Sequence, residues 1–316
     1  MVECKELKFG IEIEFTRINR ATAANVIARH FGTSATQVGG WGFDSYEVKD
    51  QQNRIWRVVR DGSVTAHRLE NNRVQIATDD YKCELVSPRL DYEDIPTLQK
   101  VVRELRRSGA GTNSSTGIHV HVGAERFTPQ SLRVLCNIVY AKQHLLYKAV
   151  LCHSSRQNRF CQPLSDGFIR QLNKKKPKTL DEFSNLWYAS VNSESPIDHR
   201  YHDSRYCILN LHNFLSRRFE TVEFRLFNGS LHAGEVKSYV QLSLLIVAQA
   251  LSQQRATKRV TAAHNGNDKY AFRVWLLRMG AISDEFKTMR HHLLKSLEGN
   301  SAWRDPAAQT LAETAD

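Results

Sequence analysis

Three short segments, far apart in the chain, alternate apolar residues with groups that bind metals or carry charge. They are residues 11–15 (I-E-I-E-F), 118–122 (I-H-V-H-V) and 222–226 (V-E-F-R-L). Successive side chains of a β-strand point to opposite faces, so each segment predicts a strand with one apolar and one functional face. If the strands lie side by side in one sheet, they bring together Glu12, Glu14, His119, His121, Glu223 and Arg225.

A further predicted strand at 81–86, stopped by Pro88, carries Glu84. Glu12, Glu14, Glu84 and Glu223 would then offer up to four carboxylates, whose mutual repulsion requires positive charge nearby. Mg²⁺ and Mn²⁺ prefer oxygen ligands, tolerate an occasional imidazole and bridge nucleotide phosphates. We therefore expect a site for two or more divalent cations, with Arg225 placed to stabilise charge on a transferred phosphoryl group.

Each motif also has a simpler interpretation. An E-x-E pair on an exposed strand is commonly a solvated surface, and an E-x-R pair is commonly a surface ion pair that contributes little to stability. Two histidines on one strand face are less common as surface residues. Their combination within dense apolar alternation favours interior strands, where unpaired charges are disfavoured, and hence a functional site.

Composition limits the class of protein. The chain has 316 residues and a formal net charge of +11, which implies an anionic partner such as nucleotide phosphates, nucleic acid or an acidic polymer. No apolar run reaches the roughly 18 residues of a membrane helix, and the charged N-terminus lacks a signal-peptide core. We expect a cytoplasmic protein without membrane insertion, and free thiols at its six scattered cysteines.

The elements that must position these residues form a mixed pattern without regular βαβ alternation. This pattern predicts an α+β fold with a mainly antiparallel sheet. Residues 154–178 read as an irregular basic loop, and residues 1–305 as one domain followed by a disordered tail at 306–316. Helices are predicted at 21–30, 94–107, 128–153, 180–189, 235–251, 270–279 and 286–297, and further extended segments at 46–59 and 205–212.

The segments F-G-I-E-I-E-F (9–15), T-G-I-H-V-H-V-G (116–123) and T-V-E-F-R-L-F (221–227) resemble, in this order, motifs of the putative amidoligase family. That family belongs to the glutamine synthetase / glutamate–cysteine ligase (carboxylate–amine ligase) superfamily. The segments 56–63 (W-R-V-V-R-D-G-S), 84–88 (E-L-V-S-P) and 155–163 (S-R-Q-N-R-F-C-Q-P) are also similar to its blocks. The resemblance covers residues 7 to 300.

The resemblance implies a glutamine synthetase catalytic-domain-like fold, in which a curved antiparallel sheet has helices on its outer face. It implies an enzyme that uses ATP and Mg²⁺ (or Mn²⁺) to form an amide or isopeptide bond through an acyl phosphate. The implied substrates are a carboxylate and an amine, on a peptide, a protein or another conjugate. The implied metal ligands are Glu12, Glu14, Glu84, His119 and Glu223.

The remaining roles come from the same resemblance. Glu223, Arg225 and His121 are the implied catalytic residues, and His119, Arg156, Arg159 and Arg225 the implied nucleotide contacts. Asp61 and Ser63 are implied substrate contacts. The N-terminal β-grasp domain of glutamine synthetases is absent, which leaves open the oligomeric state and the use of ammonia and glutamate.

Two alternatives remain open. A phosphotransferase could use the same fold, because guanidino kinases share the superfamily's sheet. A basic nucleic-acid-binding protein without catalysis would also suit the net charge, although no interleaved aromatic residues accompany the lysines at 174–178. For the main hypothesis, we expect Glu14→Ala or Glu223→Ala to abolish turnover with little loss of stability, because each removes carboxylate repulsion.

Overall fold

The computed structural model describes residues 2–39, 44–191, 193–261 and 266–303. The predicted domain end at 305 and the predicted tail at 306–316 lie outside these residues. Within them, none of the helices is long and apolar enough to cross a membrane. The six cysteines are free thiols, as expected.

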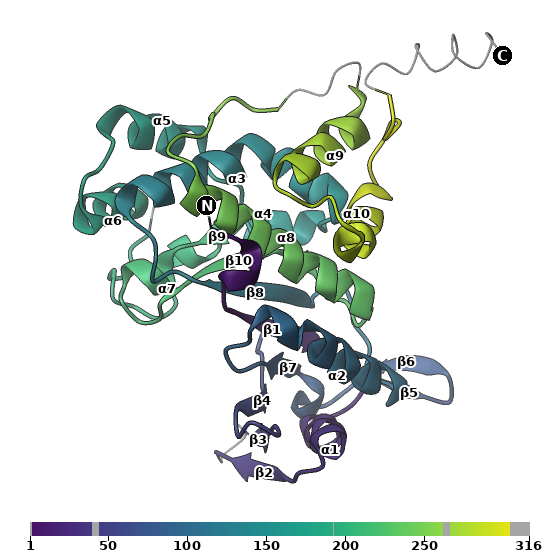
Figure 1. The fold of residues 1–316 in the computed structure, drawn as a ribbon. Coiled ribbons are helices and arrows are strands. Elements are labelled where there is room, and N and C mark those ends of the chain that lie inside the picture. The colour runs from purple at the N-terminus through teal and green to yellow at the C-terminus, as the bar shows by residue number, and fades with distance from the viewer. Residues whose placement is uncertain (1, 40–43, 192, 262–265, 304–316) are drawn as a thin grey trace, which may run out of the picture.

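One large sheet organises the molecule, as Figure 1 shows. Its eight strands follow the order β2-β3-β4-β7-β1-β8-β10-β9, and the neighbouring strands are antiparallel. This confirms the mixed α+β class with a large antiparallel sheet. The strands are β1 (Phe9–Phe15), β2 (Ala35–Val38), β3 (Ser45–Lys49), β4 (Ile55–Val59), β7 (Cys83–Val86), β8 (Gly117–Gly123), β9 (Leu209–Asn210) and β10 (Thr221–Asn228).

Helices cover one face of this sheet. Helix α8 lies across β1 and β8, α1 packs on β2 to β4, and α2 lies between α1 and α8. Helices α3 and α10 pack on α8 and form a second layer. The helices are α1 (Arg20–Phe31), α2 (Ile95–Arg107), α3 (Pro129–Ala149), α4 (Ser154–Arg159), α5 (Asp166–Lys175), α6 (Leu180–Tyr188), α7 (His212–Leu215), α8 (Ala233–Ser252), α9 (Asp268–Arg278) and α10 (Lys287–Leu294).

The apolar side chains of the central strands form the core beneath α8. Ile11, Ile13 and Phe15 of β1 are almost completely buried, as are Ile118 and Val120 of β8. Since side chains alternate along a strand, their neighbours Glu12, Glu14 and His119 lie on the opposite face of the sheet. The alternation read from the sequence therefore assigns the two faces correctly.

Several predicted elements differ from the structure. The strand predicted at 205–212 is reduced to β9, because α7 begins at His212. The segment 154–178 is not irregular. It contains α4 and α5, and α5 begins where the Ser165 side chain accepts a hydrogen bond from the backbone of Phe168. Phe168, Ile169 and Leu172 form the buried side of α5, a helical spacing that the surrounding basic residues obscured.

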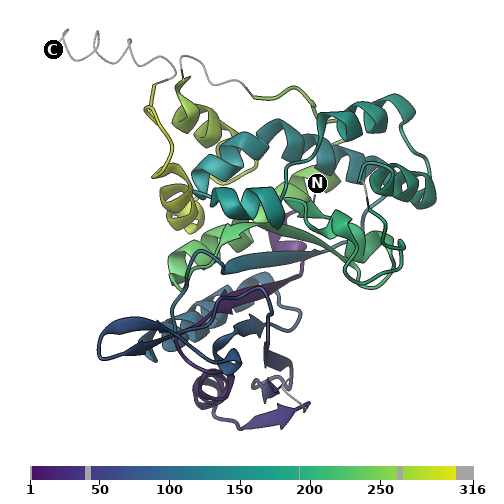
Figure 2. The same cartoon turned by 180° about the vertical axis from the view of Figure 1, so that it is seen from behind.

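The extended segment predicted at 46–59 is two strands joined by a turn. The Asp50 carboxylate closes this turn by accepting hydrogen bonds from the backbone of Gln52 and Arg54. The hairpin formed by β5 (His67–Glu70) and β6 (Arg73–Ile76) was not predicted, and it projects from the body in Figures 1 and 2.

Truncation of the central core strand should be costly. Ile13 has 0% exposure beneath α8, so Ile13→Ala should lower the free energy of unfolding by about 2–5 kcal/mol. The matched control is Ile76→Ala on the projecting hairpin, where the side chain is 83% exposed, with an expected change within about 0.5 kcal/mol. Urea unfolding measures both, and equal losses in the two variants would contradict this core assignment.

Candidate active site

The sheet register brings the predicted functional residues together on the face opposite α8. Glu12 of β1 lies opposite His119 of β8, and Glu14 lies opposite Glu84 of β7. On the other side of β8, His121 pairs with Glu223 of β10. We call this set of side chains the polar face: Glu12, Glu14, Asp61, Glu84, His119, His121, Glu223 and Arg225.

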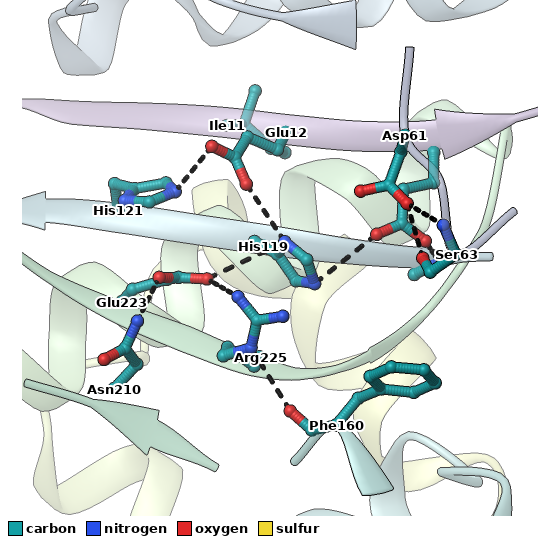
Figure 3. Close-up of polar contacts among 12 residues, drawn as sticks. Ile11, Glu12, Asp61, Ser63, His119, His121, Phe160, Asn210, Glu223 and Arg225 are labelled. Atoms are coloured by element: carbon teal, nitrogen blue, oxygen red, sulfur yellow. Dashed lines mark hydrogen bonds and ion pairs between the residues drawn. The ribbon is translucent and has the colours of Figure 1, made fainter. Parts of the chain in front are cut away.

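His119 is the centre of the polar face (Figure 3). Its Nδ1 lies 3.0 Å from Glu12 Oε2 and 3.7 Å from Glu223 Oε1. Its Nε2 lies 3.7 Å from Glu14 Oε1. The side chain is only 5% exposed, so one buried imidazole has carboxylates from two strands on either side of its own. Neighbouring His121 extends the row, with its Nε2 3.3 Å from Glu12 Oε1.

Glu223 and Arg225 form a buried ion pair at one end of the polar face (Figure 3). The Asn210 amide of β9 donates a 2.6 Å hydrogen bond to Glu223 Oε2, and Arg225 Nε donates to the carbonyl of Phe160. The register of β10 against β8 shifts between Phe224 and Phe227. Such a bulge changes the direction of a side chain, and here it falls at Arg225.

Arg156 of α4 contacts the backbone of β10 at the Arg225 end of the polar face. Its Nη2 donates a 3.1 Å hydrogen bond to the carbonyl of Arg225, and the residue is 2% exposed. A Cβ atom at Gly117 would lie 2.2 Å from Arg156 Nη2, so glycine leaves room for the guanidinium where it crosses the start of β8. The Gly117 N–H in turn donates a 2.6 Å hydrogen bond to Glu14 Oε2.

Asp61 and Ser63 lie at the opposite end, in the loop after β4. The Ser63 backbone and hydroxyl both donate hydrogen bonds to Asp61 Oδ1, which fixes that carboxylate (Figure 3). Asp61, Glu14 and Glu84 each have an oxygen within 4.8 Å of the others. The same separation holds for Glu12, Glu84 and His119, and for Glu12, His121 and Glu223.

The electrostatic balance of the polar face is uneven. At the Asp61 end, burial raises the pKa of Glu84 well above its usual value, and repulsion from Glu12, Glu14 and Asp61 adds to this rise. Burial also raises the pKa of Glu14, an effect that His119 offsets only in part. Carboxylates therefore gather here without enough positive charge from the protein.

At the Arg225 end, positive charge is sufficient. Burial opposes the ionisation of Glu223, but Arg225 and His121 outweigh it and lower the pKa of Glu223. Burial likewise opposes the charging of His121, yet Glu12 and Glu223 raise its pKa to about 9.

This donor set fits divalent cations. Carboxylate oxygens with one or two imidazoles suit Mg²⁺ and Mn²⁺, and a bound cation would remove the repulsion that raises the pKa of Glu84. Glu12, Glu14, Glu84, His119 and Glu223, the ligands expected from the sequence, do converge. Asp61, expected to contact substrate, is close enough to Glu14 and Glu84 to act as a ligand as well.

Two residues have a different place from the one expected, and one was missed. Arg159 is exposed, with its guanidinium over the ring of Phe160, outside the contacts of the polar face. Arg156 contacts the backbone of Arg225 and so acts on the arginine that faces the site. Asn210 was missed, because the apparent alternation of 205–212 gave no sign of which side chain would meet Glu223.

The contacts revise the expected effect of removing Glu223. Glu223→Gln leaves Arg225 buried without its carboxylate partner, so the variant should lose about 3–5 kcal/mol of stability. Glu14→Gln removes a carboxylate whose pKa is raised, so its stability at pH 7.5 should equal or exceed that of the wild type. Urea unfolding without metal measures both, and a Glu223→Gln variant as stable as Glu14→Gln would refute this difference.

Glu84 provides a pH-dependent test. Its pKa is higher in the folded than in the unfolded chain, so ionisation costs stability as pH rises above the unfolded value of about 4.3. Without metal, Glu84→Gln should therefore raise Tm at pH 7.5 and leave it unchanged near pH 3, where Glu84 is neutral in both the folded and the unfolded chain. The exposed Glu194→Gln is the control, expected to change Tm at neither pH. A lower Tm for Glu84→Gln at pH 7.5 would contradict the proposed repulsion.

Comparison with known proteins is consistent with this geometry. The family model described as "Putative amidoligase enzyme" matches residues 5–247, a span that contains every residue of the polar face. A search of curated proteins finds no match.

Proposed function

The chain belongs to the putative amidoligase enzyme family, and from this premise we propose that it is an ATP- and Mg²⁺-dependent carboxylate–amine ligase. It would form an amide or isopeptide bond through an acyl phosphate. The proposal rests chiefly on one observation, the convergence of buried and half-buried carboxylates from β1, β7 and β10 around His119. The family description supports a ligase, and the antiparallel sheet agrees with a glutamine synthetase-like fold, which is part of the proposal.

The proposed reaction has two steps. A carboxylate oxygen of the acid attacks the γ-phosphorus of ATP, and ADP leaves. The amine nitrogen then attacks the acyl carbon, inorganic phosphate leaves, and the nitrogen loses a proton. Both steps build negative charge on phosphoryl oxygens in a buried site, where fixed positive groups stabilise it far more than in water.

The residues divide this work between the two ends of the polar face. Glu12, Glu14, Glu84, His119 and Glu223 would hold Mg²⁺, with Asp61 as a further carboxylate. When bound, Mg²⁺ supplies positive charge that neutralises the triphosphate. Arg225 is held by Glu223 and Phe160, and its fixed guanidinium would face the transferred phosphoryl group. His121 would exchange a proton at Nε2, which lies 3.3 Å from Glu12 Oε1.

A phosphotransferase on the same fold would use the same residues up to the first step. It differs in its product, because phosphate then remains on the acceptor and no amide forms. The exposed lysines of α5, Lys174 and Lys175, lie on a surface separate from the polar face. Binding to nucleic acid through such residues would fall steeply with salt and would survive loss of the glutamates.

The ligase is tested with purified full-length chain, ATP, Mg²⁺ and pools of candidate amines with ¹⁸O-labelled acids. Calorimetry should show ATP binding that requires Mg²⁺ and is lost in Glu12→Ala. Amide formation through an acyl phosphate transfers one ¹⁸O from the acid to inorganic phosphate, whereas a phosphotransferase yields a stable phosphorylated acceptor. Absence of Mg²⁺-dependent ATP binding would refute both enzymatic proposals.

Arg225→Lys separates binding from chemistry. Lysine keeps the charge but cannot reproduce the planar fork that contacts Glu223, Phe160 and phosphoryl oxygens together. ADP release should fall by about a hundredfold or more, while the affinity for ATP with Mg²⁺ changes much less. The exposed Arg255→Lys is the matched control and should keep full activity. Equal turnover in the two variants would exclude Arg225 from the reaction.

A further inference from the structure

A second group of metal-binding side chains lies on the helical side of the sheet, away from the polar face. It consists of His232, Glu235 and His292, which stand at the start of α8 and within α10. One ligand atom from each lies within 4.8 Å of the others. The proposed ligase function does not use these residues; His232 and Glu235 lie within the matched span 5–247, and His292 lies outside it.

The geometry of this group is close to that of a coordination site. His292 Nδ1 lies 3.8 Å from Glu235 Oε1, and the rings of His232 and His292 have centroids 4.9 Å apart. Two ligands of a tetrahedral zinc ion with bonds of roughly 2.1 Å are about 3.4 Å apart, so a small movement suffices. His292 Nδ1 is buried and has no hydrogen-bond partner, an uncommon state for a polar atom.

The chain around the group holds it in place. In the metal-free chain His232 Nδ1 accepts a hydrogen bond from the Glu235 backbone, a cap that metal binding through this imidazole must replace, and Ser230 Oγ donates a 2.7 Å hydrogen bond to Glu235 Oε2. A Cβ atom at Gly234 would lie 2.7 Å from His292 Nε2, so glycine lets the imidazole rest on the first turn of α8. Backbone, hydroxyl and glycine together orient the three side chains.

We propose that His232, Glu235 and His292 bind a transition-metal ion of the Zn²⁺ class. Two imidazoles and one carboxylate suit Zn²⁺, whereas Mg²⁺ prefers sites in which oxygen ligands predominate, as on the polar face. His232 and His292 also line a cavity of about 640 Å³, together with Arg103 and Arg106 of α2. A fourth coordination position open to this cavity would accept water or an anionic group held by the arginines.

Lys295 allows a specific test of the proposed metal site, because it competes with the metal for Glu235. Its Nζ lies 2.7 Å from Glu235 Oε1, so the lysine ammonium group forms an ion pair with the oxygen that would coordinate the metal. Metal binding must displace this ammonium, which then competes with the ion. Lys295→Met should therefore strengthen metal binding, an effect opposite to that expected if the lysine only stabilised the fold.

The test is titration of the chelator-treated full-length protein with Co²⁺, followed by the visible absorption of a tetrahedral ion and by Zn²⁺ competition. His232→Ala and His292→Ala should each weaken binding at this site at least about tenfold, and Lys295→Met should tighten it severalfold. His291→Ala, which removes the exposed neighbouring imidazole, is the matched control and should bind as the wild type does.

Binding at the polar face is separable, because His232→Ala leaves that face intact and only the difference between variant and wild type is counted. His232 is exposed, so its truncation removes the cap of α8 but opens no cavity in the core, and circular dichroism checks the fold of each variant. Unchanged Co²⁺ spectra and affinities in His232→Ala and His292→Ala would overturn the proposal. Equal weakening by His291→Ala would overturn it too, since it would show unspecific binding to surface histidines.

Discussion

The structure depends on a conflict between burial and charge on one face of one sheet. Glu14 and Glu223 are 3% and 2% exposed, and further carboxylates surround them, so repulsion and desolvation act together. At the Glu223 end, Arg225 and Asn210 resolve the conflict within the protein. At the Glu84 end, burial and repulsion from the other carboxylates are not offset, and the pKa of Glu84 stays raised. An arrangement that costs stability in the free protein is expected where a cation completes it.

The rest of the fold holds this arrangement in place. Antiparallel pairing sets Glu12 beside His119 and Glu223 beside His121, and the core under α8 fixes the strands that carry them. The bulge in β10 directs Arg225, and α4 brings Arg156 onto its backbone. The proposed ligand set therefore depends on the topology of the sheet, because its members lie on separate strands between residue 12 and residue 223.

Much of this site could be predicted from the sequence, for a physical reason. Strand alternation has a period of two, so I-E-I-E-F and I-H-V-H-V state which residues share a face before any pairing is known. The order of the motifs then indicated the family, which the match to residues 5–247 confirms.

The contributions that escaped prediction come from loops and local irregularities. Asn210 meets Glu223 only because β9 is two residues long and ends where α7 begins. Asp61 was expected only as a substrate contact, and its approach to Glu14 and Glu84 was not foreseen because the turn after β4 has no periodic signal of its own. Helix α5 was not predicted, because basic residues surround the helical spacing of Phe168, Ile169 and Leu172. Such features depend on tertiary contacts, which alternation and composition do not encode.

The central claim is that these carboxylates and imidazoles bind divalent cations beneath a nucleotide triphosphate. The most direct measurement is anomalous diffraction from crystals of the protein grown with Mn²⁺ and a non-hydrolysable ATP analogue. The account predicts manganese peaks bounded by Glu12, Glu14, Glu84, His119 and Glu223, with the triphosphate directed toward Arg225. Nucleotide bound elsewhere, or a polar face without manganese at saturating concentrations, would contradict it.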